Sequence, residues 1–328
     1  RGSMLESIWI IFTKHLTILL VIYLRNGVYG MKPKLLLNVG INHCATTPFY
    51  YTLAVTQQYC HSGHKKEINY LYMIQENGGF QKYVDKITAL KTFNRDDELK
   101  PPMLKKWKWD PLELPEYFEL PFTIEKYIAA KKKDWEYIKN DYQSLADWSN
   151  SNAALSREFL TKIKPQLEEH FDVKCVIILR DPIRRLFSLS KDNDRFTKHV
   201  KKCNFTYNLA EIIPTEYQLH VYADYAGICK KWEDIWGDKF MPVIMEEFWE
   251  DPSQLSDFLE YPITEVHENV YWPEMGANYP KYKYLKDQWN PRENISEYNQ
   301  KLAQRKMSHI YQEFKEYFGY IPSSWQSW

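Results

Sequence analysis

The sequence predicts an α/β fold with three layers, α/β/α, around a central and mostly parallel sheet. Two apolar runs support this prediction. Residues 35–40, LLLNVG, lead into a loop, and residues 173–179, VKCVIIL, are nearly continuously apolar and β-branched. Such runs are typical of parallel strands that are buried on both faces. A helical pattern follows each run, which is the strand–loop–helix order of an α/β protein.

The loop after the first run is close to a phosphate-binding P-loop, which reads Gly, four residues, Gly, Lys and then Ser or Thr. Here Gly40 is followed by four residues and then by Ala45, Thr46 and Thr47, so a threonine stands in the lysine position. Backbone N–H groups and hydroxyls at a helix N-terminus still suit a 5′-phosphate. Without the lysine, which reaches the outer phosphates of a triphosphate, the loop suits ATP poorly. The pattern therefore predicts a P-loop-like fold and a nucleotide donor whose transferable group carries less charge.

A second phosphate site is predicted where the second apolar run ends. Arg180 stands at the carboxyl end of that strand, the edge at which open α/β sheets bind ligands. Pro182 suits the first turn of a helix, and that helix would place Arg185 and Ser188 on one face. An arginine fork and a hydroxyl that converge there suit a phosphate. Two phosphate sites on one sheet indicate a nucleotide that is phosphorylated at two positions.

Together the two segments resemble those of the sulfotransferases that use 3′-phosphoadenosine 5′-phosphosulfate. In that family a loop Lys-(Ser/Gly)-Gly-Thr-(Thr/Ser) holds the 5′-phosphosulfate, and His43-Cys44-Ala45-Thr46-Thr47 occupies this place. An Arg-x-Pro-x-x-Arg-x-x-Ser element holds the 3′-phosphate, matched here by the segment from Arg180 to Ser188. The stretch Tyr225–Leu259 resembles the C-terminal half of the family, so the resemblance covers residues 34–260.

The resemblance implies a donor, a product and a reaction. The donor would be 3′-phosphoadenosine 5′-phosphosulfate, the product adenosine 3′,5′-bisphosphate, and no metal would take part. A sulfuryl group would move to a hydroxyl or amine, with a carbohydrate as the expected acceptor and another hydroxyl compound as the alternative. The residues expected to bind the donor are Asn42, His43, Cys44, Ala45, Thr46, Thr47, Arg180 and Ser188.

Two residues are candidates for catalysis. Asp147 opens the segment DWSNSN, which resembles a family element whose acidic residue is the catalytic base in several carbohydrate-type enzymes; the alternative is that Asp147 caps a loop or helix. His43 stands where the family has a lysine that stabilises the leaving group. An imidazolium can donate to the same oxygen, but its reference pKa of roughly 6.5 makes the charge depend on pH. Alternatively, His43 only fills the loop and Lys281 or Lys283 supplies the cation.

Two other functions remain open at this stage. A P-loop kinase of a small molecule would fit the fold, but the loop lacks the lysine and no acidic strand end pairs obviously with it for magnesium. A nucleotide-binding pseudoenzyme without turnover would also fit, because the family lysine is replaced.

Composition and the chain ends restrict the class further. The 43 basic and 43 acidic residues balance, so no nucleic-acid partner is expected. Five scattered cysteines predict neither a disulfide framework nor a metal site. We expect a single domain over residues 31–328, preceded at 1–30 by a tag scar and an apolar extension. Residues 8–24 are too short and too charged at their centre for a favoured membrane span, which favours a cytoplasmic protein over a Golgi-type anchored one.

Between the motifs the sequence predicts further elements. The run KKKD at 131–134 is interpreted as a solvated helix face. The elements expected are helices at 48–59, 80–92, 123–140 and from about Ala153, strands at 64–74 and ending near Ala146, and an irregular region at 93–122.

Overall fold

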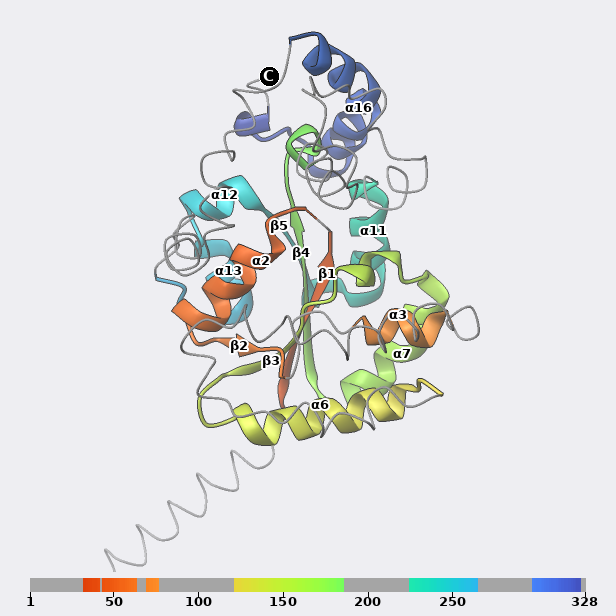
Figure 1. Cartoon of the computed structure of the whole chain (residues 1–328), viewed down its shortest axis with the longest axis vertical. Helices are drawn as coiled ribbons and strands as arrows, with labels where there is room; N and C mark the ends of the chain where they lie inside the picture. Colours follow the sequence, from red (N-terminus) through yellow and green to blue (C-terminus); the bar gives the residue numbers. More distant parts are fainter. Residues whose placement is uncertain are drawn as a thin grey trace, which may run out of the picture.

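Figure 1 shows the computed structural model of the chain, which describes residues 32–41, 43–63, 69–76, 121–185, 224–264 and 297–325. Five strands in these ranges form one parallel sheet in the order β2-β3-β1-β4-β5. The predicted α/β fold with a central parallel sheet is therefore confirmed. The strands are β1 (Lys34–Gly40), β2 (Cys60–His61), β3 (Ser144–Asp147), β4 (Asp172–Leu179) and β5 (Phe240–Ile244).

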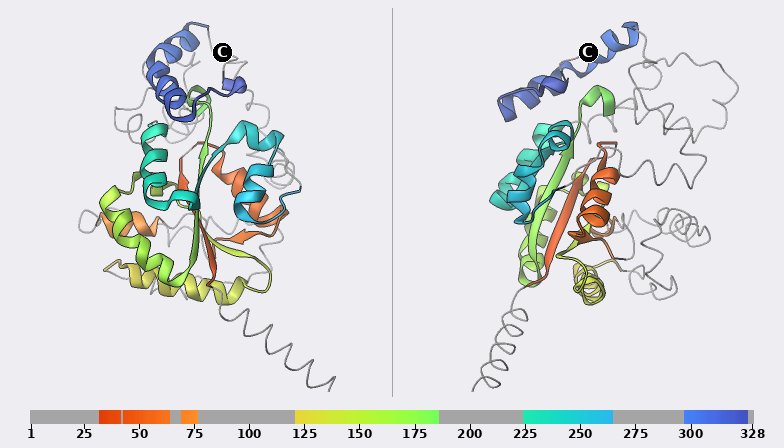
Figure 2. Two further views of the ribbon diagram at one scale, coloured as in Figure 1. Left: turned by 180° about the vertical axis from the view of Figure 1, so that it is seen from behind. Right: turned by 90° about the vertical axis from the view of Figure 1, so that its left-hand side faces the viewer.

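Helices cover both faces of this sheet. Figure 1 shows the sheet nearly edge-on, with α2, α12 and α13 on one side and α7 and α11 on the other, while α16 lies beyond the carboxyl end of β4. Figure 2 shows the same arrangement from behind and from one side. The helices are α2 (Thr46–Tyr51), α3 (Tyr70–Gln75), α6 (Ile124–Ile138), α7 (Arg157–His170), α11 (Tyr225–Trp236), α12 (Met245–Glu250), α13 (Ser253–Leu259) and α16 (Glu297–Phe318).

The central strands carry the core. From Cys175 to Leu179 every residue of β4 is fully buried, and β1 is buried from Leu35 onward. This explains why both runs are apolar without alternation, because helices shield the two faces. Both strands were predicted from the sequence, and both are confirmed within a residue or two of the expected limits.

Helix starts follow ordinary capping chemistry. The Thr123 side chain accepts a hydrogen bond from Lys126 N at the start of α6, and that of Ser156 accepts from Phe159 N at the start of α7. The predicted helix at 123–140 is thus confirmed. The helix expected from about Ala153 is instead a 3₁₀ turn, η5 (Asn150–Ala154), followed by α7, because the serine cap sets a later start.

Two further predictions need correction. The strand expected at 64–74 is wrong where the chain is described, since Tyr70–Gln75 forms a helix, while residues 64–68 lie outside the described ranges. Short apolar runs do not distinguish strand from helix by pattern alone. The helix expected at 48–59 begins earlier, at Thr46, and passes into a π-helical segment, η1 (Thr52–Thr56). The elements expected at 80–92 and 93–120 lie outside the described residues.

The predicted N-terminal extension at 1–30 also lies outside the described ranges. Among the helices that are described, none combines the length and the apolar character needed to cross a bilayer. The described elements share one apolar core.

Candidate active site

The loop after β1 begins at Gly40, where the backbone conformation and the lack of space for a Cβ both favour glycine. Gly40 has a φ of 125°, and a Cβ there would lie 2.7 Å from the carbonyl oxygen of Asn150. The register of β1 against β4 also shifts between Asn38 and Gly40, where the strand leaves the ladder. Gly40 therefore lets the chain turn away from the sheet in close contact with η5.

The rest of this loop leads directly into α2. His43 and Ala45 both have positive φ, 67° and 56°, and α2 begins at Thr46. Cys44 and Thr46 are buried, while the indole N–H of Trp148 donates to the Thr46 carbonyl at 2.7 Å. The loop thus has the strand–turn–helix form that phosphate binding requires. Asn42, also predicted to contact the donor, lies outside the described residues.

Arg180 meets this loop from the neighbouring strand. It directly follows β4, the strand beside β1, and its Nη1 donates to the carbonyl of His43 at 3.4 Å. The two elements that the sequence predicted as separate phosphate sites are therefore in contact at one edge of the sheet. Residues 182–185 are helical, as expected after Pro182, and Ser188 lies outside the described residues.

Tyr225 joins the two elements from α11. Its hydroxyl donates to the Arg180 carbonyl at 2.9 Å and lies 3.8 Å from Cys44 Sγ. The side chain is almost fully buried. In the sequence Tyr225 is one of 25 tyrosines, and no local pattern identifies it, because both partners are distant in the chain.

Positive charge gathers around the loop. Arg180 is partly buried and Arg185 is 3% exposed. Burial lowers the pKa of the Arg180 guanidinium, and the Glu246 carboxylate opposes that shift. Burial raises the pKa of the Cys44 thiol, and the charges of Arg185 and Arg180 oppose it. Both guanidinium groups thus act on the loop, where they would favour an anion.

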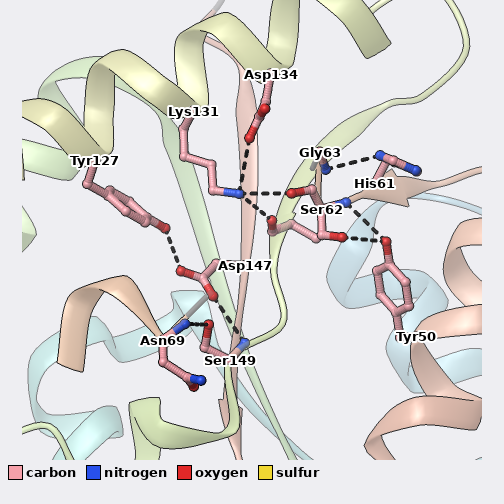
Figure 3. Close-up of polar contacts among 11 residues, drawn as sticks. Tyr50, His61, Ser62, Gly63, Asn69, Tyr127, Lys131, Asp134, Asp147 and Ser149 are labelled. Atoms are coloured by element: carbon pink, nitrogen blue, oxygen red, sulfur yellow. Dashed lines mark hydrogen bonds and ion pairs between the residues drawn. The ribbon is translucent and has the colours of Figure 1, made fainter. Parts of the chain in front are cut away.

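Asp147 lies on the other side of β1, as the last residue of β3. It is fully buried; its Oδ2 accepts from the Tyr127 hydroxyl at 2.9 Å and its Oδ1 from Ser149 N at 3.0 Å, as Figure 3 shows. Each carboxylate oxygen can accept about two hydrogen bonds, so acceptor capacity remains. The contacts fix the carboxylate rigidly and match the capping alternative, while the role of base stays a prediction.

The interpretation of residues 131–134 as a solvated face is wrong for two of the four. Lys131 and Asp134 are fully buried and form an ion pair at 3.5 Å. Lys131 Nζ also donates to the carbonyl of Ser62 at 3.1 Å, as Figure 3 shows. It donates to the carbonyl of Ala146 at 3.0 Å as well. The buried face of α6 repeats at Tyr127, Lys131 and Asp134, a helical spacing that the run of four charges concealed.

These two carbonyls explain why a lysine is buried there. The pairing of β2 with β3 ends at His61 and Leu145, and the carbonyls of the next residues, Ser62 and Ala146, receive the ammonium instead. A buried carbonyl without a donor is costly. Within the described ranges no group of three His, Cys, Asp or Glu side chains is arranged to hold a metal ion.

Comparison with known proteins gives a fold but no sequence relative. No protein-family model and no curated protein matches this sequence. Among solved structures, a sulfotransferase from Alicyclobacillus acidocaldarius aligns over 90% of this chain and 99% of its own, with a TM-score of 0.53 and 15% identity. This chain has a sulfotransferase fold.

Two further sulfotransferase structures align less closely. The sulfotransferase domain of the curacin biosynthetic pathway covers 76% of this chain and 78% of its own at 17% identity and a TM-score of 0.38. A sulfotransferase from Mycobacterium avium covers 87% of this chain and 76% of its own at 13% identity and a TM-score of 0.39. The likeness in fold rests on the Alicyclobacillus acidocaldarius structure, and at 15% identity it describes the fold alone, so the activity rests on the residues themselves.

Proposed function

We propose that this protein transfers a sulfuryl group from 3′-phosphoadenosine 5′-phosphosulfate to a hydroxyl or amine. The observation that carries the proposal is the contact between Arg180 Nη1 and the His43 carbonyl. It joins the two elements expected to hold the 5′-phosphosulfate and the 3′-phosphate, at the carboxyl ends of adjacent parallel strands. That edge is where open α/β sheets bind nucleotides.

The donor would be held by the loop and by the end of β4. The backbone of residues 42–47 and the hydroxyls of Thr46 and Thr47 would contact the 5′-phosphosulfate, and Arg180 with Ser188 would contact the 3′-phosphate. The burial of Cys44 and Thr46 supports a loop that is shaped before the donor arrives, which lowers the cost of binding.

The transfer needs a base for the acceptor proton and a donor for the leaving oxygen. In the proposed reaction the acceptor oxygen forms a bond to sulfur while the bond from sulfur to the bridging oxygen breaks. The bridging oxygen keeps the electron pair and receives a hydrogen bond from the His43 imidazolium. The acceptor proton passes to the carboxylate of Asp147. Asp147 is fully buried, so this step requires the acceptor to gain access to its carboxylate.

The proposed acceptor is a carbohydrate. This rests on the resemblance of residues 147–152 to the corresponding element of glycan-type sulfotransferases. A panel of oligosaccharides and simple phenols, assayed with donor labelled at sulfur, tests the acceptor class by the appearance of labelled product.

Calorimetry separates the proposed donor from the kinase alternative. Adenosine 3′,5′-bisphosphate should bind more tightly than ATP with magnesium, because the loop lacks a lysine for the outer phosphates. Tighter binding of ATP would contradict the proposal. Binding of the bisphosphate without turnover on any acceptor would instead favour the pseudoenzyme.

A further inference from the structure

The C-terminal part of the chain donates two hydrogen bonds to buried carboxylates, one just after β4 and one on α12. The hydroxyl of Tyr311, on α16, donates to Asp181 Oδ2 at 3.0 Å. The indole N–H of Trp325, in the 3₁₀ turn η9 (Ser323–Trp325), donates to Glu246 Oε2 at 3.0 Å. Asp181 is the residue after Arg180, so α16 contacts the neighbourhood of the predicted 3′-phosphate site directly, and η9 contacts it through Glu246, which accepts from Asp181 N.

The two carboxylates are themselves tied to the turn after β4. Asp181 Oδ1 accepts from the backbone N–H of Arg184 at 2.8 Å, which caps the helical turn at 182–185. Glu246 Oε1 accepts from Asp181 N at 3.4 Å and lies 4.0 Å from Arg184 Nη1. Each donor on the C-terminal segment therefore holds a carboxylate that in turn holds the backbone beside Arg180.

Aromatic packing fixes the segment in place. Trp325 is 2% exposed and its ring lies 4.6 Å from that of Phe314, which is fully buried. The Trp325 ring also contacts Tyr311 at 6.3 Å and Tyr225 at 6.4 Å, both near edge-to-face. Tyr225 is the residue that donates to the Arg180 carbonyl. The segment thus contacts the surroundings of Arg180 in two ways, through the ring of Tyr225 and through the carboxylates of Asp181 and Glu246.

The hydrogen bonds matter because the carboxylates are costly to bury. Burial raises the pKa of Asp181 to about 6, while the N–H of Arg184 and the hydroxyl of Tyr311 oppose that shift. Loss of the Tyr311 donor would leave a buried acceptor poorly satisfied, and the turn that Asp181 caps would be less firmly held.

We propose that Tyr311 and Trp325 are positioning residues for the 3′-phosphate of the donor. They act through Asp181 and Glu246 to hold the turn from Arg180 to Arg185 in its binding orientation, without touching the nucleotide. This inference rests on the proposed function, because it takes a 3′-phosphorylated nucleotide as the ligand of Arg180.

The test compares two nucleotides on matched variants. Tyr311→Phe removes one donor and keeps the ring, while Trp325→Phe removes the indole N–H together with one of its two fused rings. Tyr317→Phe is the control, because Tyr317 also lies on α16 and also donates to a carboxylate, that of Glu233 on α11. Calorimetry should show about tenfold weaker binding of adenosine 3′,5′-bisphosphate for Tyr311→Phe, and nearly unchanged binding of adenosine 5′-phosphate. Tyr317→Phe should bind both like the wild type.

A second arm asks whether the effect passes through Arg180. In an Arg180→Ala background, Tyr311→Phe should cause no further loss of bisphosphate affinity. Thermal unfolding of each variant checks that the fold is retained.

The outcomes separate this inference from the function beneath it. Wild-type protein that does not bind the bisphosphate overturns both. Wild-type protein that binds it, with unchanged affinity in both Tyr311→Phe and Trp325→Phe, overturns the positioning role alone. Equal losses for the two nucleotides, or an equal loss in Tyr317→Phe, overturn it as well, because the effect would then be one of general stability.

Discussion

Asp147 and Asp181 are both buried aspartates at the carboxyl ends of strands, and each accepts a hydrogen bond from a tyrosine hydroxyl. They differ in where that tyrosine comes from. Tyr127 is 20 residues from Asp147 on the helix that precedes its strand, whereas Tyr311 is 130 residues from Asp181. The surroundings also differ, because Glu246 contacts the Asp181 backbone while Ser149 N completes the contacts of Asp147. Asp147 belongs to the proposed acceptor side of the site and Asp181 to the proposed donor side, so the first is held by nearby chain and the second by distant chain.

The largest effect should come from the acceptor side. Asp147→Asn should lower kcat by roughly 10²–10⁴-fold, the usual range for a positioned general base, while bisphosphate affinity and fold are retained. Steady-state kinetics with calorimetry provide the measurement. If Asp147→Asn keeps near wild-type turnover, Asp147 is not the base, and its role is the structural cap formed by its hydrogen bond from Ser149 N.

Lys131→Met tests the buried ion pair on the same side. Removing one partner of such a pair costs about 3–5 kcal/mol, and here the carbonyls of Ser62 and Ala146 also lose a donor. Urea unfolding should show a loss of this size, against less than about 0.5 kcal/mol for the exposed neighbour in Lys133→Met. Equal midpoints for the two variants would contradict the role assigned to Lys131.

His43 tests the donor side, where this chain departs from the sulfotransferase pattern. His43→Ala should lower kcat about 10²–10³-fold, as the loss of one donor to a developing oxyanion does, and leave bisphosphate binding largely intact. The pH–rate profile should fall on its alkaline side as the imidazolium loses its proton. His43→Lys should move that alkaline limb toward roughly pH 10. An alkaline limb that stays in place would show that another group titrates.

Asp181 should make stability depend on pH, since its pKa is raised to about 6 from an ordinary 3.8. The folded state then favours the protonated form, so this contribution is fully present below about pH 4. As the pH rises from about 4 to about 6, the free energy of unfolding falls by about 3 kcal/mol. Above about pH 6 the contribution of Asp181 no longer changes with pH. Denaturant unfolding of the wild type and Asp181→Asn across this range measures it. The stability of the wild type relative to the variant should fall with rising pH, and a rising difference would refute the assignment.

The smallest effect concerns Arg180 itself. Arg180→Ala should weaken adenosine 3′,5′-bisphosphate on the order of tenfold or more, because charged hydrogen bonds contribute about 1.5–3 kcal/mol. Affinity for adenosine 5′-phosphate should hardly change. Arg157→Ala, at an exposed ion pair with Asp234, serves as the control. Equal losses for both nucleotides would remove Arg180 from the 3′-phosphate site.

What the sequence could predict follows the same division between near and distant chain. The two apolar strands, the loop at Gly40 and the place of Arg180 depend on local pattern, and the structure confirms both strands. The contact of Arg180 with the His43 carbonyl could be expected from strand order, since carboxyl ends of parallel neighbours meet at one edge. Side-chain roles at these positions remain predictions.

The remainder depends on contacts that no local pattern encodes. Tyr225 is 181 residues from Cys44, and Trp325 is 79 residues from Glu246. The burial of Lys131 was concealed because four consecutive charges usually mark an exposed surface. The buried carboxylate of Asp134 and the backbone carbonyls at the end of the β2–β3 ladder both bind the ammonium group there, and the carbonyls carry no side-chain signature.

The central position of β1 has a consequence for how the chain is made. Its partners lie at residues 144–147 and 172–179, so the strand that carries the loop leaves the ribosome long before either neighbour exists. Until β3 and β4 are synthesised, the run LLLNVG presents unpaired backbone and apolar side chains to other nascent chains. Parallel pairing of this kind is slow, because distant segments must be brought together first. Yield in a cell should therefore respond to chaperone supply and to the rate of translation across residues 144–179 more than to changes in the loop.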